Sequence, residues 1–341
     1  MISDMRALVT GGNGHIGYAL VRELLAAGHT VRASVRVLDD WHTAPFEGLD
    51  VEVVGADVRD ADSLRAATDG MDTLFHVAAV YSLTDPGRER EIIATSVQGA
   101  ENALRAAAAT GVRKVVLTSS VAALPLTAKG APAVTEAEWR TDLRVPYMRA
   151  KTEAEQLAWR LARELGLDLA TVLPGGVIGP GFRRNTPTVD IVQAALGGMF
   201  RPGAPEGNFT FVDVRDVARA HLLAAEPGVT GRFAVIDVQP SFRELVGELH
   251  RIDPRVRRPL LTLPRLLVPA LPMYDRLCHR LLGTPRIATP EVVATSVSGL
   301  WWNVSSERAR AELGWAPTVP FEQSLRETVR VLQDRRAATA A

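Results

Sequence analysis

Two residues whose types and spacing suit acid–base chemistry are Tyr147 and Lys151, which stand four positions apart in a segment predicted to be helical. Residues i and i+4 share one face of a helix, so the phenol and the ammonium are expected to be neighbours. A nearby ammonium lowers the pKa of a phenol, which makes it a usable proton donor near neutral pH. Lys114, Lys129 and Lys151 are the only lysines of the chain. The pair is therefore a catalytic candidate, although a tyrosine on a helix face is more often an ordinary core aromatic.

A glycine-rich segment, residues 10–17, lies between the first predicted strand and the first predicted helix and reads Thr-Gly-Gly-Asn-Gly-His-Ile-Gly. Glycines permit a tight turn there and let backbone N–H groups approach a pyrophosphate at the helix N-terminus. Alone, such a cluster could be an ordinary turn, but its place in a strand–loop–helix pattern predicts a dinucleotide site. The residues expected to contact the dinucleotide are Gly11, Gly14, His15, Ile16 and Gly17.

The end of the second predicted strand bears on the choice of cofactor. An acidic residue about 20 positions after the glycines would bind the ribose 2′-hydroxyl of NAD. Here Arg36 directly follows the strand, and its guanidinium suits the extra phosphate of NADP, although a solvated arginine is the alternative. We therefore expect NADP(H) rather than NAD(H), with Asp57 and Val58 near the adenine.

The elements that must position these residues alternate between strand and helix in the first half of the chain. The predicted strands are residues 7–9, 30–35, 51–54, 73–77, 112–117 and 168–173, and the predicted helices are 18–27, 60–68, 88–109 and 145–165. This rhythm predicts an α/β Rossmann fold, a doubly wound parallel sheet with helices on both faces. From Pro174 to residue 209 the chain is expected to be a loop, followed by a strand over 209–212 and a helix over 213–225.

The change of rhythm after Pro174 also suggests how the chain divides into domains. We expect residues 1–174 to form the NADP-binding domain, with a segment of about 208–240 returning to it. Residues 175–207 and 241–335 are expected to form a smaller, partly interleaved substrate-binding domain. It would cover the carboxyl edge of the sheet, where ligands of such sheets bind.

Composition argues against several classes of protein. The chain has 39 basic and 39 acidic residues and no basic run, which argues against nucleic acid and against a membrane surface as partners. The single cysteine, Cys278, excludes an internal disulfide, and the seven histidines lack the spacing of metal ligands, so no metal is expected. No apolar stretch reaches the roughly 18 residues of a spanning helix, and no signal-peptide pattern is seen. We therefore expect a cytoplasmic protein.

Together, these motifs resemble those of the extended short-chain dehydrogenase/reductase family, over nearly the whole chain. The matching segments are residues 10–17, 57–58, 75–79, 118–120, 147–151, 174–180 and 312–315. The chain is most similar to the branch of dihydroflavonol 4-reductases and cinnamoyl-CoA or aldehyde reductases, since residues 30–36 match that branch's second strand, including the arginine that meets the 2′-phosphate.

The resemblance implies a catalytic serine, tyrosine and lysine at Ser120, Tyr147 and Lys151, with Ser119 supporting the nicotinamide end of the cofactor. Many members place an asparagine of a proton relay where this chain has Ser96. The resemblance also implies cofactor contacts at Val77, Ala78, Ala79, Pro174 and Val177.

Two absences narrow the expected substrate. Residues 121–124 lack the Asp-Glu pair of sugar-nucleotide dehydratases, and Leu173 and Gly176 stand where epimerases of the family carry an arginine and an asparagine. Apolar side chains expected around the cleft suit a hydrophobic carbonyl compound, although any of them could be ordinary core. The residues predicted for this pocket are Tyr81, Leu124, Met148 and Met199.

The leading hypothesis is an NADPH-dependent reductase of ketones or aldehydes, with Tyr147 as proton donor, that acts on an apolar small molecule of aromatic or polyketide-like type. One alternative is a sugar or polyol-type epimerase with tightly bound NAD. Others are an NADP-binding sensor or scaffold without turnover, and a steroid-type dehydrogenase running in the oxidative direction. Since the helices predicted over 88–109 and 145–165 often pair between subunits in this family, we also expect a homodimer.

Overall fold

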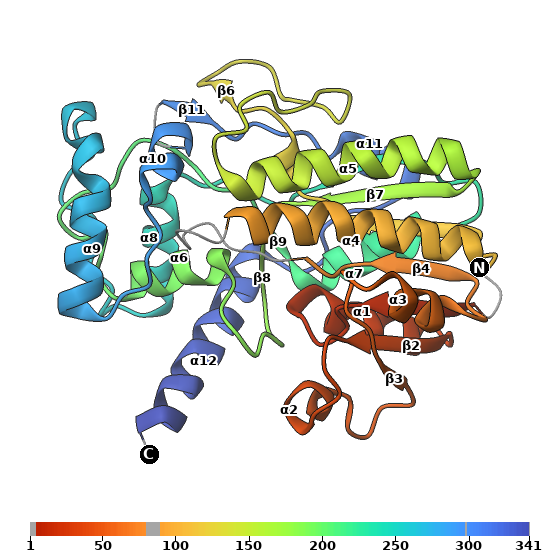
Figure 1. The fold of residues 1–341 in the computed structure, drawn as a ribbon. Helices are drawn as coiled ribbons and strands as arrows, with labels where there is room; N and C mark the ends of the chain where they lie inside the picture. Colours follow the sequence, from red (N-terminus) through yellow and green to blue (C-terminus); the bar gives the residue numbers. More distant parts are fainter. Residues whose placement is uncertain (1–4, 80–88, 297–298, 341) are drawn as a thin grey trace.

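The computed structural model describes residues 5–79, 89–296 and 299–340, and its centre is a seven-stranded parallel sheet with helices on both faces (Figure 1). The strands are β1 (Arg6–Thr10), β2 (Thr30–Val35), β3 (Glu52–Gly55), β4 (Thr73–His76), β5 (Lys114–Thr118), β7 (Asp168–Pro174) and β10 (Gly231–Val235). Their order in the sheet is β10-β7-β5-β4-β1-β2-β3. This arrangement confirms the predicted doubly wound α/β fold.

The central strands are apolar throughout because both faces of the sheet are covered. In β1, Ala7 and Val9 pack into one core and Leu8 into the other, and all three side chains are fully buried. The first core lies under α1 (His15–Ala26), α7 (Val214–Ala224) and α11 (Glu307–Leu313). The second lies under α3 (Ala61–Thr68), α4 (Glu89–Ala109) and α5 (Pro146–Leu165).

Helix α5 carries the Tyr147–Lys151 pair, and its two ends have the expected stop signals. Pro146 occupies the first turn, where its missing N–H has no helical partner to lose. Gly166 ends the helix in a left-handed conformation with φ 67°. Tyr147 and Lys151 both belong to the buried face of the helix, so the pair lies on one side of α5 as its spacing predicted.

A third core lies beyond one end of the main sheet (Figure 1). It is formed by β8 (Gly176–Ile178), α6 (Pro187–Leu196), β9 (Phe211–Asp213), α8 (Phe242–Ile252) and α12 (Phe321–Ala340). Helix α11, from the same late part of the chain, packs instead on α7 and β10 of the main sheet. The chain after residue 241 therefore contributes to both regions, and the division into two domains stays a prediction.

The prediction of a loop from Pro174 to residue 209 was wrong, because the stretch contains β8 and α6. Thr186 caps α6 by accepting a hydrogen bond from the Val189 N–H, and Pro187 opens the first turn. The expected strand over 209–212 begins later, as β9, and pairs with β8 outside the main sheet. Helix α1 starts three residues before the predicted position because the glycine loop leads directly into it.

The remaining elements are short or lie at the periphery. They are α2 (Asp40–Thr43), η1 (Ala44–Phe46), η2 (Val121–Ala123), β6 (Thr127–Ala128), η3 (Arg265–Ala270), α9 (Leu271–Leu282), α10 (Pro290–Ser296) and β11 (Leu300–Trp301). Among the helices of the described ranges, none is both long and apolar enough to cross a lipid bilayer.

Candidate active site

A cavity of about 670 Å³ opens at the carboxyl ends of the central strands. Its wall includes the glycine loop, Arg36 and Asp57 on one side, and apolar side chains such as Met199 and Phe200 on the other. Tyr147 and Lys151 also lie in this wall. The cavity therefore joins the expected dinucleotide site to the space expected for a substrate, as in other sheets of this topology.

The glycine loop has a backbone that only glycine fits at two positions. Gly11 has φ 65°, and a Cβ on Gly17 would lie 2.2 Å from the Gly11 carbonyl oxygen. The N-terminus of α1 starts at Gly14, and no side chain caps its first N–H groups. Such a bare helix N-terminus beside a close-packed glycine turn suits a pyrophosphate, so these residues fit a dinucleotide.

The end of the cavity beside Arg36 and Asp57 is rich in guanidinium groups. Arg59 holds the Asp57 carboxylate with two hydrogen bonds, Nε–Oδ1 at 3.0 Å and Nη2–Oδ2 at 2.6 Å, and thereby lowers the pKa of Asp57 below its usual range. Arg36 is exposed in the cavity wall, and within the described ranges no carboxylate forms an ion pair with it. Sequence reasoning missed Arg59 and Trp41, which also lines the cavity here.

Two arginines of the loop after β8 also lie at this end of the cavity. Arg183 and Arg184 lie 4.6 and 4.1 Å from the ring centroid of Trp41, in cation–π contact. Both arginines line the cavity. The local excess of positive charge favours a ligand with phosphate groups at this end.

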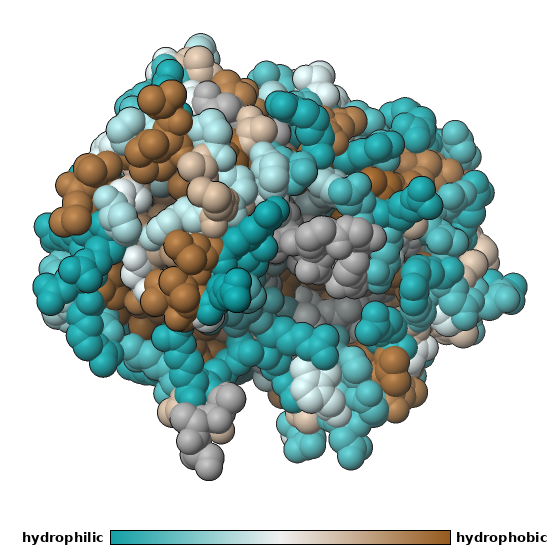
Figure 2. Space-filling view, turned by 60° about the vertical axis from the view of Figure 1, so that its left-hand side comes forward, coloured by the Kyte–Doolittle hydropathy of each residue, from teal (hydrophilic) through white to brown (hydrophobic). Residues whose placement is uncertain are grey.

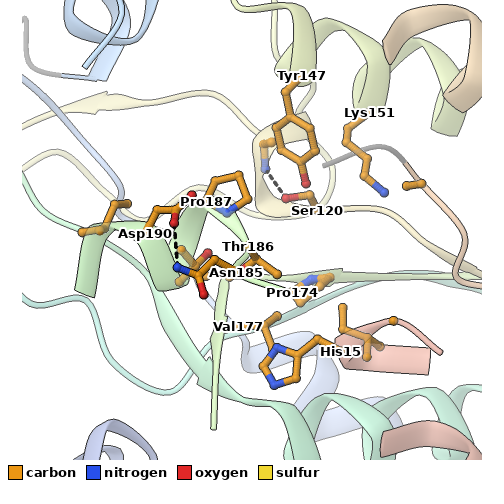
Figure 3. A pocket seen from close by; sticks show the side chains of 18 of the residues that line it. His15, Ser120, Tyr147, Lys151, Pro174, Val177, Asn185, Thr186, Pro187 and Asp190 are labelled. Atoms are coloured by element: carbon orange, nitrogen blue, oxygen red, sulfur yellow. Dashed lines mark hydrogen bonds between the residues drawn. The ribbon is translucent and has the colours of Figure 1, made fainter. Parts of the chain in front are cut away.

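Ser120, Tyr147 and Lys151 meet in the middle of the cavity, where the hydroxyl groups of Ser120 and Tyr147 point toward each other (Figure 3). All three side chains belong to residues that are at most 8% exposed. The Ser120 Oγ accepts a hydrogen bond of 3.1 Å from the Ala122 N–H at the start of η2. Because that bond uses only a lone pair, the Ser120 hydroxyl hydrogen stays available to a ligand.

Lys151 is held by the end of β5. Its Nζ donates to the Thr118 carbonyl oxygen at 2.9 Å, which leaves two of its three hydrogens for other acceptors. Burial lowers the pKa of Lys151 to about 8, and the Glu155 carboxylate partly opposes this change. The amine therefore carries its charge at neutral pH and lies on the same side of α5 as Tyr147.

Glu155 extends the series Tyr147–Lys151 by four more residues, and sequence reasoning missed it. Its carboxylate accepts hydrogen bonds from Ser119 Oγ at 2.7 Å, Thr171 Oγ1 at 2.7 Å and Arg232 Nε at 2.8 Å. The Glu155 side chain is fully buried and that of Arg232 is 8% exposed. Ser119, expected at the nicotinamide, lines the cavity but donates its hydroxyl hydrogen to Glu155.

Two histidines link neighbouring segments near the cavity, and His15 also lies in the cavity wall, where a contact with the dinucleotide stays a prediction. His15 Nε2 lies 3.0 Å from the Pro180 carbonyl oxygen and so links the glycine loop to the segment after β8, and burial lowers its pKa to about 4. His76 Nδ1 lies 3.1 Å from Thr10 Oγ1, and burial lowers its pKa to about 3. Both rings are neutral at neutral pH. Ser96 borders a small second cavity behind Lys151, together with His76.

The other residues predicted at the site have these positions. The cavity wall includes Ile16, Val58, Val77, Ala78, Ala79, Met148, Pro174 and Val177. The prediction that Leu124 lines the substrate pocket was wrong. Leu124 is absent from the cavity wall and is fully buried in a core with Leu173 and Ala234. Tyr81 lies outside the described residues.

Several polar wall residues were not anticipated. They are Glu91, Thr95, Asn185, Thr186, Thr188, Asp190, Asn208, Tyr274 and Arg286. Asn185 Nδ2 donates to Asp190 Oδ1 at 2.9 Å (Figure 3). Within the described ranges, no group of three or more His, Cys, Asp or Glu side chains could hold a metal ion.

Comparison with known proteins agrees with this geometry. The family model described as "NAD dependent epimerase/dehydratase family" matches residues 7–236. The chain is 36% identical over 324 residues to "Sterol demethylase protein B" of Methylococcus capsulatus, covering 92% of this chain and 94% of that protein. It is 37% identical over 264 residues to cinnamoyl-CoA reductase 1 of Oryza sativa subsp. japonica, covering 72% and 75%.

Among solved structures, that of gox2253 has a TM-score of 0.81 and 30% sequence identity, and the match covers 98% of this chain and 99% of that one. Family model, relatives and fold are thus consistent. The chain therefore belongs to the NAD-dependent epimerase/dehydratase family, among the extended short-chain dehydrogenases/reductases, and is an oxidoreductase that uses a nicotinamide dinucleotide.

Proposed function

We propose that this protein is an NADPH-dependent carbonyl reductase. Its substrate is an apolar compound of aromatic or polyketide-like type that carries a ketone or aldehyde group. The observation that carries the proposal is the meeting of Ser120, Tyr147 and Lys151 in a cavity that continues from the glycine loop to apolar side chains. The name of the rice relative, a cinnamoyl-CoA reductase, supports a carbonyl group next to an aromatic body.

Each of the three residues has a distinct task in this mechanism. When bound against the glycine loop, the reduced dinucleotide supplies a hydride for the carbonyl carbon. Ser120 and Tyr147 donate hydrogen bonds to the carbonyl oxygen, and Tyr147 transfers its proton as negative charge develops there. Lys151 stabilises the tyrosinate that remains, with the two Nζ hydrogens not used by Thr118.

The apolar part of the cavity limits the shape of the substrate. Met148, Met199, Phe200, Tyr274 and Trp302 contribute to its wall. These side chains can enclose a ring system and offer few partners to the many hydroxyl groups of a sugar. The epimerase alternative is disfavoured further at Leu173, which is fully buried in the core and not in the cavity wall.

A second candidate is oxidation or reduction of a sterol-type alcohol or ketone by the same residues. It is favoured by the relative named sterol demethylase protein B, whose similarity spans almost the full length of both chains. The direction of such a reaction depends on the cellular ratio of the oxidised to the reduced dinucleotide. A steroid ketone therefore belongs among the first substrates to be tried.

The proposal predicts consumption of NADPH with at least one member of a panel of aromatic aldehydes, apolar ketones, a steroid ketone and a cinnamoyl thioester. The product should be the corresponding alcohol or, from the thioester, the aldehyde, identified by mass spectrometry. The panel should include a nucleotide-linked sugar as the epimerase arm. Turnover of that sugar by protein isolated with bound NAD, with no carbonyl compound reduced, would reject the proposal.

Arg36 is predicted to set the preference for NADPH. In Arg36→Ala, the KM for NADPH should rise about 10- to 100-fold, because a charge-assisted hydrogen bond contributes roughly 1.5–3 kcal/mol, and the KM for NADH should change little. Arg65→Ala, an exposed arginine of α3, is the matched control. Equal changes in the two KM values would show that Arg36 does not contact the 2′-phosphate.

A further inference from the structure

Large apolar side chains are exposed on one side of the molecule, over η3, α9 and the residues just before them. Of the twelve large apolar residues that are exposed in the described ranges, eight lie within residues 260–282. These eight, which we call the α9 surface, are Leu260, Leu261, Leu266, Leu267, Met273, Leu277, Leu281 and Leu282. Figure 2 turns this side forward and shows hydrophobic residues gathered on it. Such a concentration on a protein surface marks an interaction site.

Helix α9 has a buried inner face and an exposed outer face. Its inner face buries Asp275 and Cys278, and the neighbouring Tyr274 reaches the wall of the active-site cavity. Its outer face carries Met273 and Leu277, followed by Leu281, at intervals of four residues, with exposed fractions of 72%, 51% and 69%. One helix thus separates the cavity from an exposed apolar stripe, so whatever covers the stripe lies next to the substrate space.

The same segment has a strong excess of positive charge. Residues 257–286 contain six arginines and one acidic residue, whereas the whole chain has zero net charge. The acidic residue, Asp275, is buried and bonded to Arg286. Of the exposed arginines, Arg265 pairs with Glu206. The other four form no ion pair within the described ranges: Arg257, Arg258, Arg276 and Arg280.

We propose that the α9 surface docks the protein on a lipid membrane with anionic headgroups. Exposed leucines beside arginines are the pattern of helices that lie in a membrane interface, with the apolar face in the acyl boundary and the basic groups on headgroup phosphates. A second copy of the chain is a poorer partner, because pairing this surface with itself would bring arginines of like charge together. The expectation of no membrane partner rested on the zero net charge and on the absence of a basic run, and neither reveals arginines that are spread over residues 257–286.

Docking in this orientation would place the bilayer against the outer face of α9, so that this helix would lie between the acyl region and the cavity. The docking itself does not depend on which compound is reduced, and its test needs no activity measurement, so it can fail or succeed independently of the proposed function.

The test is flotation of the purified full chain with vesicles of phosphatidylcholine alone or of phosphatidylcholine mixed with phosphatidylglycerol. The wild type should float with the mixed vesicles, less at high salt and less with phosphatidylcholine alone. In Leu266→Ser/Met273→Ser/Leu277→Ser and, separately, in Arg276→Glu/Arg280→Glu, the bound fraction should fall about tenfold or more. Leu38→Ser, which changes a 59% exposed leucine outside this surface, should float like the wild type.

Several outcomes would overturn the proposal. They are no flotation of the wild type, flotation of both multiple variants equal to that of the wild type, or size-exclusion chromatography in which the wild type is a dimer and the leucine variant is a monomer. The last result would make the α9 surface a subunit interface. Since the arginine variant changes only exposed side chains, it keeps the test decisive if the leucine variant fails to fold.

Discussion

Replacing Tyr147 by phenylalanine is expected to lower kcat about 10²- to 10⁴-fold, the range that a positioned general acid contributes. The residue is 8% exposed and packs beside Met148, so removal of one oxygen keeps the ring in place. The Kd for NADPH should therefore stay near the wild-type value. Stopped-flow or steady-state NADPH consumption measures kcat, and quenching of tryptophan fluorescence measures the Kd for NADPH.

Tyr18→Phe is the matched control for this experiment. Tyr18 lies on α1 beside the phenyl ring of Phe46 and is outside the cavity wall, so its variant should keep wild-type kcat. If Tyr147→Phe retained activity within tenfold of the wild type, the proton would have to come from another group, and the assignment of Tyr147 would be wrong.

Replacing Glu155 by alanine is expected to lower the free energy of unfolding by about 3–5 kcal/mol, the usual cost of removing one partner from a buried ion pair. The variant leaves the Arg232 guanidinium in a site that is 8% exposed, and Ser119 loses the acceptor of its 2.7 Å hydrogen bond. The melting temperature should fall by roughly 10 °C, since each kcal/mol corresponds to a few degrees in a protein of this size.

The same helix offers a matched control at Glu153, which pairs with Arg149 on the exposed face at 2.7 Å. Glu153→Ala should change the free energy of unfolding by less than about 1 kcal/mol, as is usual for a surface ion pair. The double variant Glu155→Leu/Arg232→Leu should regain part of the lost stability, because it removes both charges. Equal melting temperatures for Glu155→Ala and Glu153→Ala would contradict the importance of the buried pair.

The sequence predicted those parts of the fold that depend on local periodicity and stop signals. Strand β2 has the predicted bounds, 30–35, because the β-branched Thr30, Val31 and Val35 favour a strand and Gly28 ends the helix before it. Helix α6 was missed because prolines and glycines on both sides concealed a ten-residue helix. The candidate catalytic residues could be found because i, i+4 spacing on a helix translates directly into proximity.

The remaining parts depend on contacts between distant segments or on exposure. Trp41 and Arg183 meet at the cavity although 142 residues separate them in the chain. Leu266 and Leu281 look like core residues in the sequence, and only their exposed fractions of 90% and 69% distinguish them from the core. Glu155 could have been found, since it repeats the spacing of Tyr147 and Lys151.

The backbone amide that occupies one lone pair of Ser120 has a stereochemical consequence. With the Ala122 N–H fixed on Oγ, the hydroxyl can rotate only between a few directions, and Figure 3 shows it facing Tyr147. A prochiral ketone can accept both hydrogen bonds in two orientations, related by a half-turn about its C=O axis, which expose opposite faces to the hydride. The apolar wall around Met199 and Phe200 must therefore distinguish the two flanking groups, and the enantiomeric excess of the alcohol should rise with the difference in their size.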